Sequence, residues 1–276
     1  MRLTLRKIII AVSAVVLTAS CSSEFDKLLA SYDVPVKYKA AFEYFDAEKY
    51  NRAAELFESL SLSTRGTAQD DTVQYYWALS NYKFKDYVTA ESNFTQFLSV
   101  FPSSPFTVEA EFIRIDCLFR MSHRYELDQT PTHKCLLYVD RFMIERNQPE
   151  NEKYLEPCRK MQADLNERLD KKAYEAAHLY YHMDDYLAAH YALKNVLKED
   201  ADNIYREDIL YYTCMSAYKY AANSIEEKQK ERYMTFMDDY YQFVSEYPES
   251  KKVKELEALY AKVNRIIKRK GLADEE

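Results

Sequence analysis

The chain has 276 residues, 47% of them hydrophobic, and its 38 Lys and Arg against 45 Asp and Glu leave a formal net charge of −7. An excess of acidic residues is unsuited to neutralising phosphates, so the composition argues against nucleic-acid binding. Gly66 and Gly271 are the only glycines, which excludes GxGxxG and P-loop motifs and leaves few positions for sharp turns. The composition therefore predicts an all-α protein.

The first 20 residues have the three parts of a signal peptide. A start with three basic residues is followed by an apolar run over 8–17 and by small residues over 18–20. The run is about half the length that a helix needs to cross a bilayer. Leu17 to Cys21 resembles the lipobox of bacterial lipoproteins, in which the cysteine thiol takes a diacylglyceryl group and the new amino group is acylated after cleavage. We therefore predict lipidation at Cys21, and losing the three basic residues would take the net charge from −7 to −10. The alternative is an ordinary secretory signal with an incidental cysteine.

A spaced pattern of tyrosine, small and bulky residues then recurs along the chain. Tyrosines start each copy, and positions 3, 7 and 10 after them share one helical face. The tyrosines are Tyr50, Tyr87, Tyr186 and Tyr233; the small residues at offset 3 are Ala53, Ala90 and Ala189; and alanines nine residues before a tyrosine are Ala41, Ala78 and Ala177. Small residues let two helices cross closely, so this pattern predicts tetratricopeptide hairpins of about 34 residues.

Other parts of the chain fit the repeat less closely. A third hairpin is expected, with its first helix over 108–121. In its second helix Cys135 takes the small position, and Val139 and Phe142 take the next two positions of the pattern. A long charged helix is expected over 152–172. The fifth hairpin has Phe236 in the small position and a longer first helix over 209–222, so we expect it to open wider. A final amphipathic helix over 251–270 is expected to cap the array.

The predicted fold is thus an all-α tetratricopeptide-repeat solenoid of about five hairpins with a C-terminal capping helix. The predicted divisions are a signal peptide (1–20), a lipidated linker (21–33), repeats 1–3 (34–147), repeats 4–5 with the capping helix (148–270) and a tail (271–276). Apart from Cys21, the cysteines are Cys117, Cys135, Cys158 and Cys214. Because they are widely spaced and the chain is large enough for a core, we expect mostly buried thiols, with a Cys117–Cys135 bridge as the pairing to check.

The concave face of such a solenoid is lined mainly by the first helices of its hairpins. Tyrosine offers a rigid apolar ring with a polar tip, which suits an extended peptide, although core packing is the usual role of an aromatic side chain at helical spacing. The candidate client-binding residues in the first two repeats are Tyr38, Glu43, Tyr44, Gln74, Tyr75, Asn81 and Tyr82.

Evidence for catalysis is weak. His178 and His182 lie one helical turn apart, but a catalytic zinc needs three protein ligands and the glutamate of an HExxH motif is missing. No nucleophile elbow is present. We expect no catalytic residue, no metal and no cofactor, and we predict that the protein is not an enzyme. A metal-dependent enzyme centred on the two histidines is the least favoured alternative.

In addition to the repeat pattern, three segments resemble the BamD family, the tetratricopeptide-repeat lipoproteins of the outer-membrane β-barrel assembly machinery. They are FPSSPF at 101–106, RYELDQTPT at 124–132 and YYHMDDYLAAHYALKNVL at 180–197. The chain departs from the family where KEDADN follows position 197 in place of a Tyr-Pro. Ser23 and Glu24 resemble the export signal of Bacteroidota lipoproteins, which suggests that branch of the family.

The resemblance implies a binding function. In the family, the C-terminal repeats dock on a POTRA domain of BamA, and the N-terminal repeats are thought to receive the C-terminal strand of an unfolded outer-membrane protein. We accordingly expect a lipid-anchored, periplasm-facing protein of the outer membrane, in which residues 170–247 dock BamA and the first half handles clients. The alternative is a general periplasmic scaffold lipoprotein serving cell-wall or polysaccharide machinery.

Overall fold

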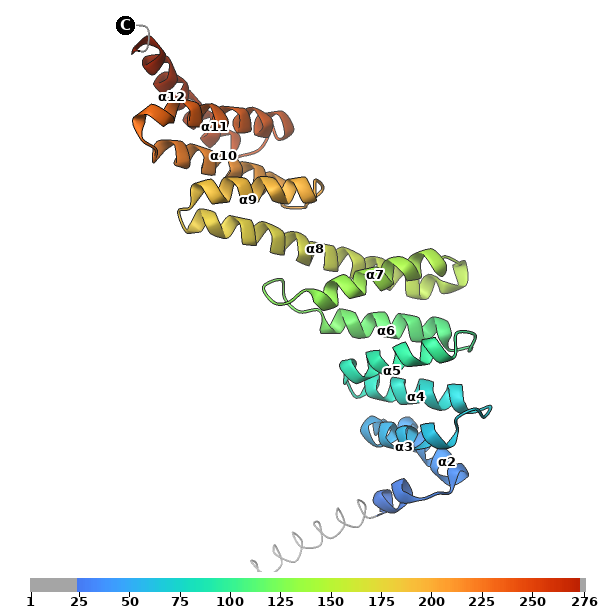
Figure 1. The fold of residues 1–276 in the computed structure, drawn as a ribbon. Coiled ribbons are helices and arrows are strands. Elements are labelled where there is room, and N and C mark those ends of the chain that lie inside the picture. Colours follow the sequence, from blue (N-terminus) through green and yellow to red (C-terminus); the bar gives the residue numbers. More distant parts are fainter. Residues whose placement is uncertain (1–23, 274–276) are drawn as a thin grey trace, which may run out of the picture. The chain divides into compact units, whose positions relative to one another are not determined.

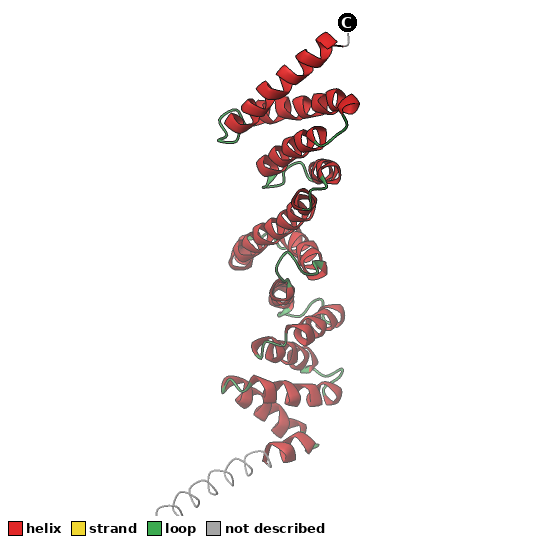
Figure 2. Cartoon of the chain, turned by 90° about the vertical axis from the view of Figure 1, so that its left-hand side faces the viewer, coloured by secondary structure: helices red, strands yellow, loops and turns green. Residues whose placement is uncertain are grey.

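The computed structural model describes residues 24–273, and in this range every regular element is a helix (Figures 1 and 2). Residues 24–30 are helical. The elements that follow are α2 (Val34–Asp46), α3 (Tyr50–Ser63), α4 (Asp70–Lys83), α5 (Tyr87–Val100), α6 (Thr107–Met121), α7 (Thr130–Glu145), the 3-10 helix η1 (Pro149–Asn151), α8 (Glu152–His182), α9 (Tyr186–Glu199), α10 (Arg206–Ala222), α11 (Glu226–Glu246) and α12 (Val253–Ala273). Among the described residues no helix is both long and apolar enough to cross a bilayer.

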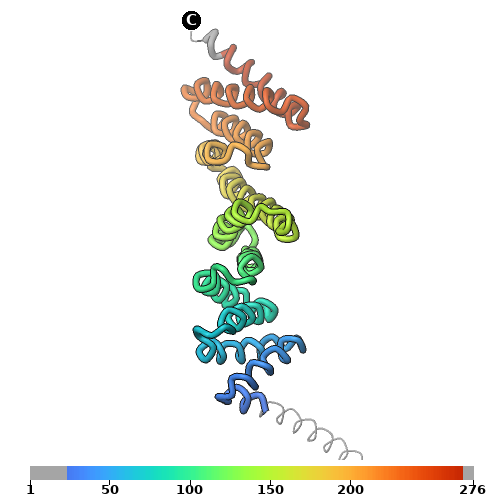
Figure 3. Tube along the Cα trace, turned by 90° about the vertical axis from the view of Figure 1, so that its right-hand side faces the viewer, coloured from blue at the N-terminus to red at the C-terminus, as the bar shows by residue number. Residues whose placement is uncertain are grey.

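The fold is the predicted all-α tetratricopeptide-repeat solenoid. The hairpins are α2–α3, α4–α5, α6–α7, the C-terminal part of α8 with α9, and α10–α11, followed by α12. Figure 3 follows the backbone through them. The described residues form two compact units, one comprising 24–123 and 129–161 and the other 124–128 and 162–273. The units divide within α8, and the domain bounds expected from the sequence stay a prediction.

The turns inside three hairpins share one geometry. Glu48, Lys85 and Asp184 have positive φ values of 58°, 69° and 60°, which place them in the left-handed region. At each turn the next amide reaches back five residues, as in the bond from Lys49 N to the Tyr44 carbonyl (2.9 Å). This is the Schellman arrangement, in which glycine usually takes the left-handed position. Because the chain has almost no glycine, side-chain-bearing residues take the left-handed position in these turns, at a steric cost.

The helices after these turns start at predicted positions. Asp86 accepts a hydrogen bond from the Thr89 amide and Asp185 accepts one from the Ala188 amide, both at 3.1 Å. An aspartate in this position satisfies an amide that has no partner inside the helix. α5 and α9 therefore begin at the repeat tyrosines Tyr87 and Tyr186.

The first unit has its core between facing hairpins. Phe57, Phe94 and Phe97 are at most 1% exposed, and they lie at offsets 7 and 10 from the repeat tyrosines, on the predicted helical face. The small residues expected at helix crossings throughout the chain are all buried: Ala41, Ala53, Ala78, Ala90, Ala177 and Ala189. Cys135, Val139 and Phe142 are buried too, which confirms how the third repeat was placed.

The fifth hairpin buries a larger side chain at the small position of the repeat. Phe236 is fully buried where repeats one, two and four have alanine, and it packs edge-on against Tyr218 with 5.6 Å between ring centroids. α11 starts at Glu226, seven residues before Tyr233, so this tyrosine does not mark the helix start as it does in α5 and α9. Leu256 and Val263 of α12 are fully buried in the same core, as predicted for a capping helix.

One element differs from its predicted extent. The charged helix over 152–172 does not end before the fourth repeat, because α8 runs unbroken for 31 residues to His182. Its only helix breaker, Pro157, lies near its start, and neither proline nor glycine follows it in the helix. Nothing in the local sequence therefore separates the charged helix from the first helix of the fourth hairpin.

Cys117, Cys135, Cys158 and Cys214 are buried thiols, so no Cys117–Cys135 bridge forms in the described structure. Burial raises the pKa of Cys117 to about 12 and that of Cys158 to about 11. A thiol shielded in this way is a poor nucleophile, because the thiolate is the reactive form. The four side chains serve as small apolar residues of the core.

Candidate functional site

The candidate client-binding residues lie on α2 and α4, the first helices of the first two hairpins. Tyr38 is half-buried and its ring lies 5.0 Å from that of Phe42, which in turn packs edge-on against Phe57 and Tyr76. Burial, together with neighbouring Tyr76 and Asp71, raises the pKa of Tyr38. Tyr38 therefore presents one edge to solvent while the aromatic core orients its ring.

Glu43 and Tyr44 lie further along α2. Glu43 is exposed and forms a 3.6 Å ion pair with Lys39. Tyr44 packs edge-on against Phe25 at 5.4 Å, and the guanidinium of Arg52 lies over both rings. Phe25 is 6% exposed, so Tyr44 and Arg52 hold the helical segment over 24–30 against the first hairpin. Much of the Tyr44 ring is thus occupied by the protein's own chain.

Two of the candidates on α4 are not accessible. Tyr75 is 2% exposed and stacks on Phe106, with 4.3 Å between centroids and 10° between planes. Asn81 is 8% exposed and donates from Nδ2 to the Trp77 carbonyl at 3.1 Å. Burial, reinforced by Glu109, raises the pKa of Tyr75 far above its ordinary value. In this conformation both side chains pack the first unit and do not face a groove.

Tyr82 belongs to a polar network that joins the second and third hairpins. Its hydroxyl donates to Asp116 Oδ2 at 2.5 Å, and Arg120 Nε donates to the same oxygen. Arg120 also lies over the rings of Tyr82 and Tyr87. Asp116 and Arg120 were not among the predicted residues. A carboxylate and a guanidinium at i and i+4 on one helix are a sequence signal from which this pair could have been predicted.

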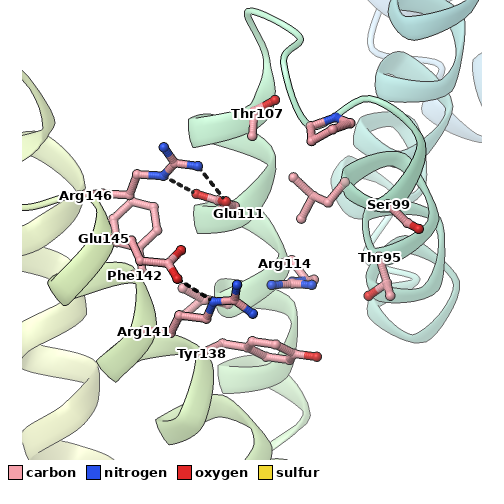
Figure 4. A pocket seen from close by; sticks show the side chains of 13 residues that line it. Thr95, Ser99, Thr107, Glu111, Arg114, Tyr138, Arg141, Phe142, Glu145 and Arg146 are labelled. Atoms are coloured by element: carbon pink, nitrogen blue, oxygen red, sulfur yellow. Dashed lines mark hydrogen bonds and ion pairs between the residues drawn. The ribbon is translucent and has the colours of Figure 1, made fainter.

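Several hollows lie in the first unit. Gln74 lines one of about 190 Å³, with Arg65, Gln96 and Phe101 among its neighbours. Another, of about 450 Å³, is formed by α5, α6 and α7 and is lined by three arginines and two glutamates (Figure 4). None of the candidate client-binding residues lines this second pocket.

The two histidines lie close together in the second unit. The rings of His178 and His182 are 4.3 Å apart, and His178 also contacts the rings of Tyr174 and Tyr212. Burial, and then the neighbouring His182, lowers the pKa of His178, which keeps its ring neutral. Over residues 24–273 no cluster of three or more His, Cys, Asp or Glu could hold a metal ion. His178 is therefore part of an aromatic stack in this structure.

The predicted lipidation residue, Cys21, lies outside the residues that the structure describes. Comparison with known families covers most of the chain that follows it. Residues 33–233 match the family model of the YfiO outer membrane lipoproteins. The chain belongs to this family. The match runs from just before α2 into α11 and so includes both compact units. No curated protein matches the chain significantly.

Membership of the YfiO family confirms the resemblance to BamD-type lipoproteins at the level of the family. It also associates the protein with the outer membrane, as predicted. The helical-repeat fold agrees with this assignment, since the family match covers the tetratricopeptide hairpins themselves.

Proposed function

We propose that the protein is a lipid-anchored scaffold for outer-membrane protein assembly, which binds the POTRA region of BamA and unfolded β-barrel clients. The observation that supports this most strongly is the YfiO match across the helical repeats. Solenoids of this kind act by presenting an extended binding surface. The proposed role is therefore binding without catalysis, with no cofactor, and with the chain facing the periplasm.

Accessible groups on the first two hairpins support the client-binding part of the proposal. Tyr38, Gln74 and Tyr82 are half-buried and Glu43 is exposed, so each offers part of its surface. An unfolded β-strand carries alternating aromatic side chains and unpaired backbone groups. Partly exposed tyrosines and an amide can hold such a strand weakly, which suits a protein that must hand its client on.

Exposed apolar side chains in the second unit support the docking part. Leu179 near the end of α8 and Met183 in the turn after it are 56% and 67% exposed, and Tyr191 on α9 is 62% exposed. They fall within residues 170–247, the segment proposed to dock BamA. Exposed apolar side chains of this kind are available for a protein interface.

Capture from membranes tests the proposal. A photocrosslinking residue placed at Met183 should capture BamA, and one at Glu43 should capture unfolded barrel proteins instead. Both positions are exposed, so the crosslinker itself should not disturb packing. Equal capture of BamA from the two positions would contradict the division of roles. Recovery of cell-wall or polysaccharide proteins without BamA would favour the general periplasmic scaffold.

Replacing Cys21 with alanine tests the anchor. The variant should move from the membrane fraction to the soluble periplasmic fraction or stay uncleaved, because acyl chains supply about 0.8 kcal/mol per buried methylene and two or more are needed for firm attachment. Fractionation followed by immunoblotting measures this. Ser22→Ala is the matched control and should fractionate like the parent protein. A cleaved Cys21→Ala protein that remains fully on membranes would show that something other than lipid holds it there.

A further inference from the structure

Arg114 is the unusual residue of the pocket formed by α5, α6 and α7 in the first unit. It projects from α6, and its guanidinium carbon lies 3.9 Å from the centre of the Tyr138 ring on α7. Its Nε atom is buried and has no hydrogen-bond partner. A buried N–H without an acceptor costs free energy, so such a group calls for an explanation.

The two glutamates of the pocket lining are bound to other cations. Glu111 accepts two hydrogen bonds from Arg146, at 2.7 and 2.9 Å, and Glu145 accepts one from Arg141 at 2.8 Å. A third carboxylate, Glu91 on α5, is bound by Lys134 at 2.9 Å.

The pocket wall is thus left with an unsatisfied positive group. Its lining contains three arginines and two glutamates, and Arg114 is the arginine of this lining that forms no ion pair. Burial lowers the pKa of Arg114, while Tyr138, Glu91 and Glu111 act in the opposite direction and Arg141 adds to the lowering. The guanidinium remains charged in this setting, because its ordinary pKa is above 12.

The pocket lining combines polar and apolar side chains. Figure 4 shows Arg114 and Tyr138 facing the side of the pocket formed by α5, where Thr95 and Ser99 lie. Apolar groups complete the lining, among them Leu98, Pro102 and Phe142. An acidic side chain next to an apolar one would meet both kinds of surface.

We propose that this pocket binds an internal Asp or Glu side chain of a protein partner, with its carboxylate on the guanidinium of Arg114. Arginine binds carboxylates through its N–H groups, and stacking on Tyr138 holds the guanidinium in place for this. Because Nε is buried, the terminal Nη atoms are the ones that would meet the carboxylate. The acidic segment is a partner feature distinct from the barrel clients and the POTRA region proposed above, and the inference does not depend on either.

Fluorescence anisotropy of the full chain in detergent tests the proposal. The probe is a labelled, acetylated and amidated peptide of sequence Gly-Ser-Phe-Glu-Leu-Ser-Gly, compared with its Glu→Gln twin. We expect the acidic peptide to bind about tenfold or more tightly than its twin, since hydrogen bonds to charged groups are the stronger ones. In Arg114→Met the ratio should fall to near one, and in Arg114→Lys, which keeps the charge without the planar fork, it should be intermediate.

Stability and control variants separate binding from packing. Arg114→Met should fold with an unchanged or higher unfolding midpoint, because it removes an unpaired buried N–H and keeps an unbranched apolar stem. Arg159→Met, an arginine on α8 that does not line the pocket and is paired with Glu152, should leave the peptide ratio unchanged. An unchanged ratio in Arg114→Met, or absence of binding by the acidic peptide at millimolar concentration, would overturn the proposal.

Two further probes distinguish other ligands. A peptide whose only carboxylate is its free C-terminus should bind more weakly than the peptide with an internal Glu; tighter binding would overturn the assignment to a side chain. Inorganic phosphate at low millimolar concentration should not displace the acidic peptide, and displacement would overturn the carboxylate assignment in favour of a phosphate site.

Discussion

Replacing Phe236 with alanine should lower the free energy of unfolding by about 3–5 kcal/mol, the range typical of removing a buried aromatic ring. Phe236 is fully buried in α11 and contacts Tyr218 of α10, and Tyr240 lies 6.4 Å away on its own helix. Alanine would leave a cavity that these large neighbours can fill only in part. Urea denaturation followed by circular dichroism measures the loss.

The position makes this test informative about the repeat. Phe236 occupies the offset where repeats one, two and four carry alanine, so a repeat consensus alone would suggest that alanine is tolerated there. The structure predicts the reverse, because the second unit has packed around the larger side chain. Met234→Ala on the same helix is the control, since Met234 is 56% exposed and should change stability by no more than about 0.5 kcal/mol. A loss below about 1 kcal/mol for Phe236→Ala would contradict the packing described here.

Replacing Asp239 with alanine should cost about 3 kcal/mol, because it removes the carboxylate from a buried polar cluster. Asp239 of α11 is 4% exposed; its Oδ2 lies 2.7 Å from His190 Nε2, and its Oδ1 accepts a hydrogen bond from Lys194 at 2.9 Å. His190 and Lys194 lie one turn apart on α9, so the cluster joins two helices that each also pack against α10. Without the carboxylate, His190 is left buried without this partner.

The neighbouring residue gives a matched control. Asp238 is exposed on the same helix, and Asp238→Ala should change the free energy of unfolding by less than about 0.5 kcal/mol. Asp239→Asn keeps an oxygen acceptor and should lose less stability than Asp239→Ala. A double-mutant cycle with His190→Ala isolates the pairwise interaction. Additive losses in that cycle would show that the two side chains do not stabilise each other.

Local features of the chain were predictable because they depend on spacing. Alanine at helix crossings, bulky residues four and seven positions later and aspartate before α5 and α9 follow from the 3.6-residue period of a helix and from capping. These features determine the helices, the hairpins and the all-α class. The family resemblance also rested on segments within the repeats, and the YfiO match agrees with it.

The roles of individual polar and aromatic residues depended on tertiary contacts. Tyr75 and Tyr82 lie on one helix and looked equivalent in the sequence, yet Phe106 covers Tyr75, whereas Asp116, 34 residues away, binds the hydroxyl of Tyr82. The partners of Asp239 and the lack of an acceptor for Arg114 Nε are likewise properties of packed helices. Periodicity shows which face of a helix is apolar, but only the neighbouring helix decides which side chains on that face are covered and which polar groups find a partner.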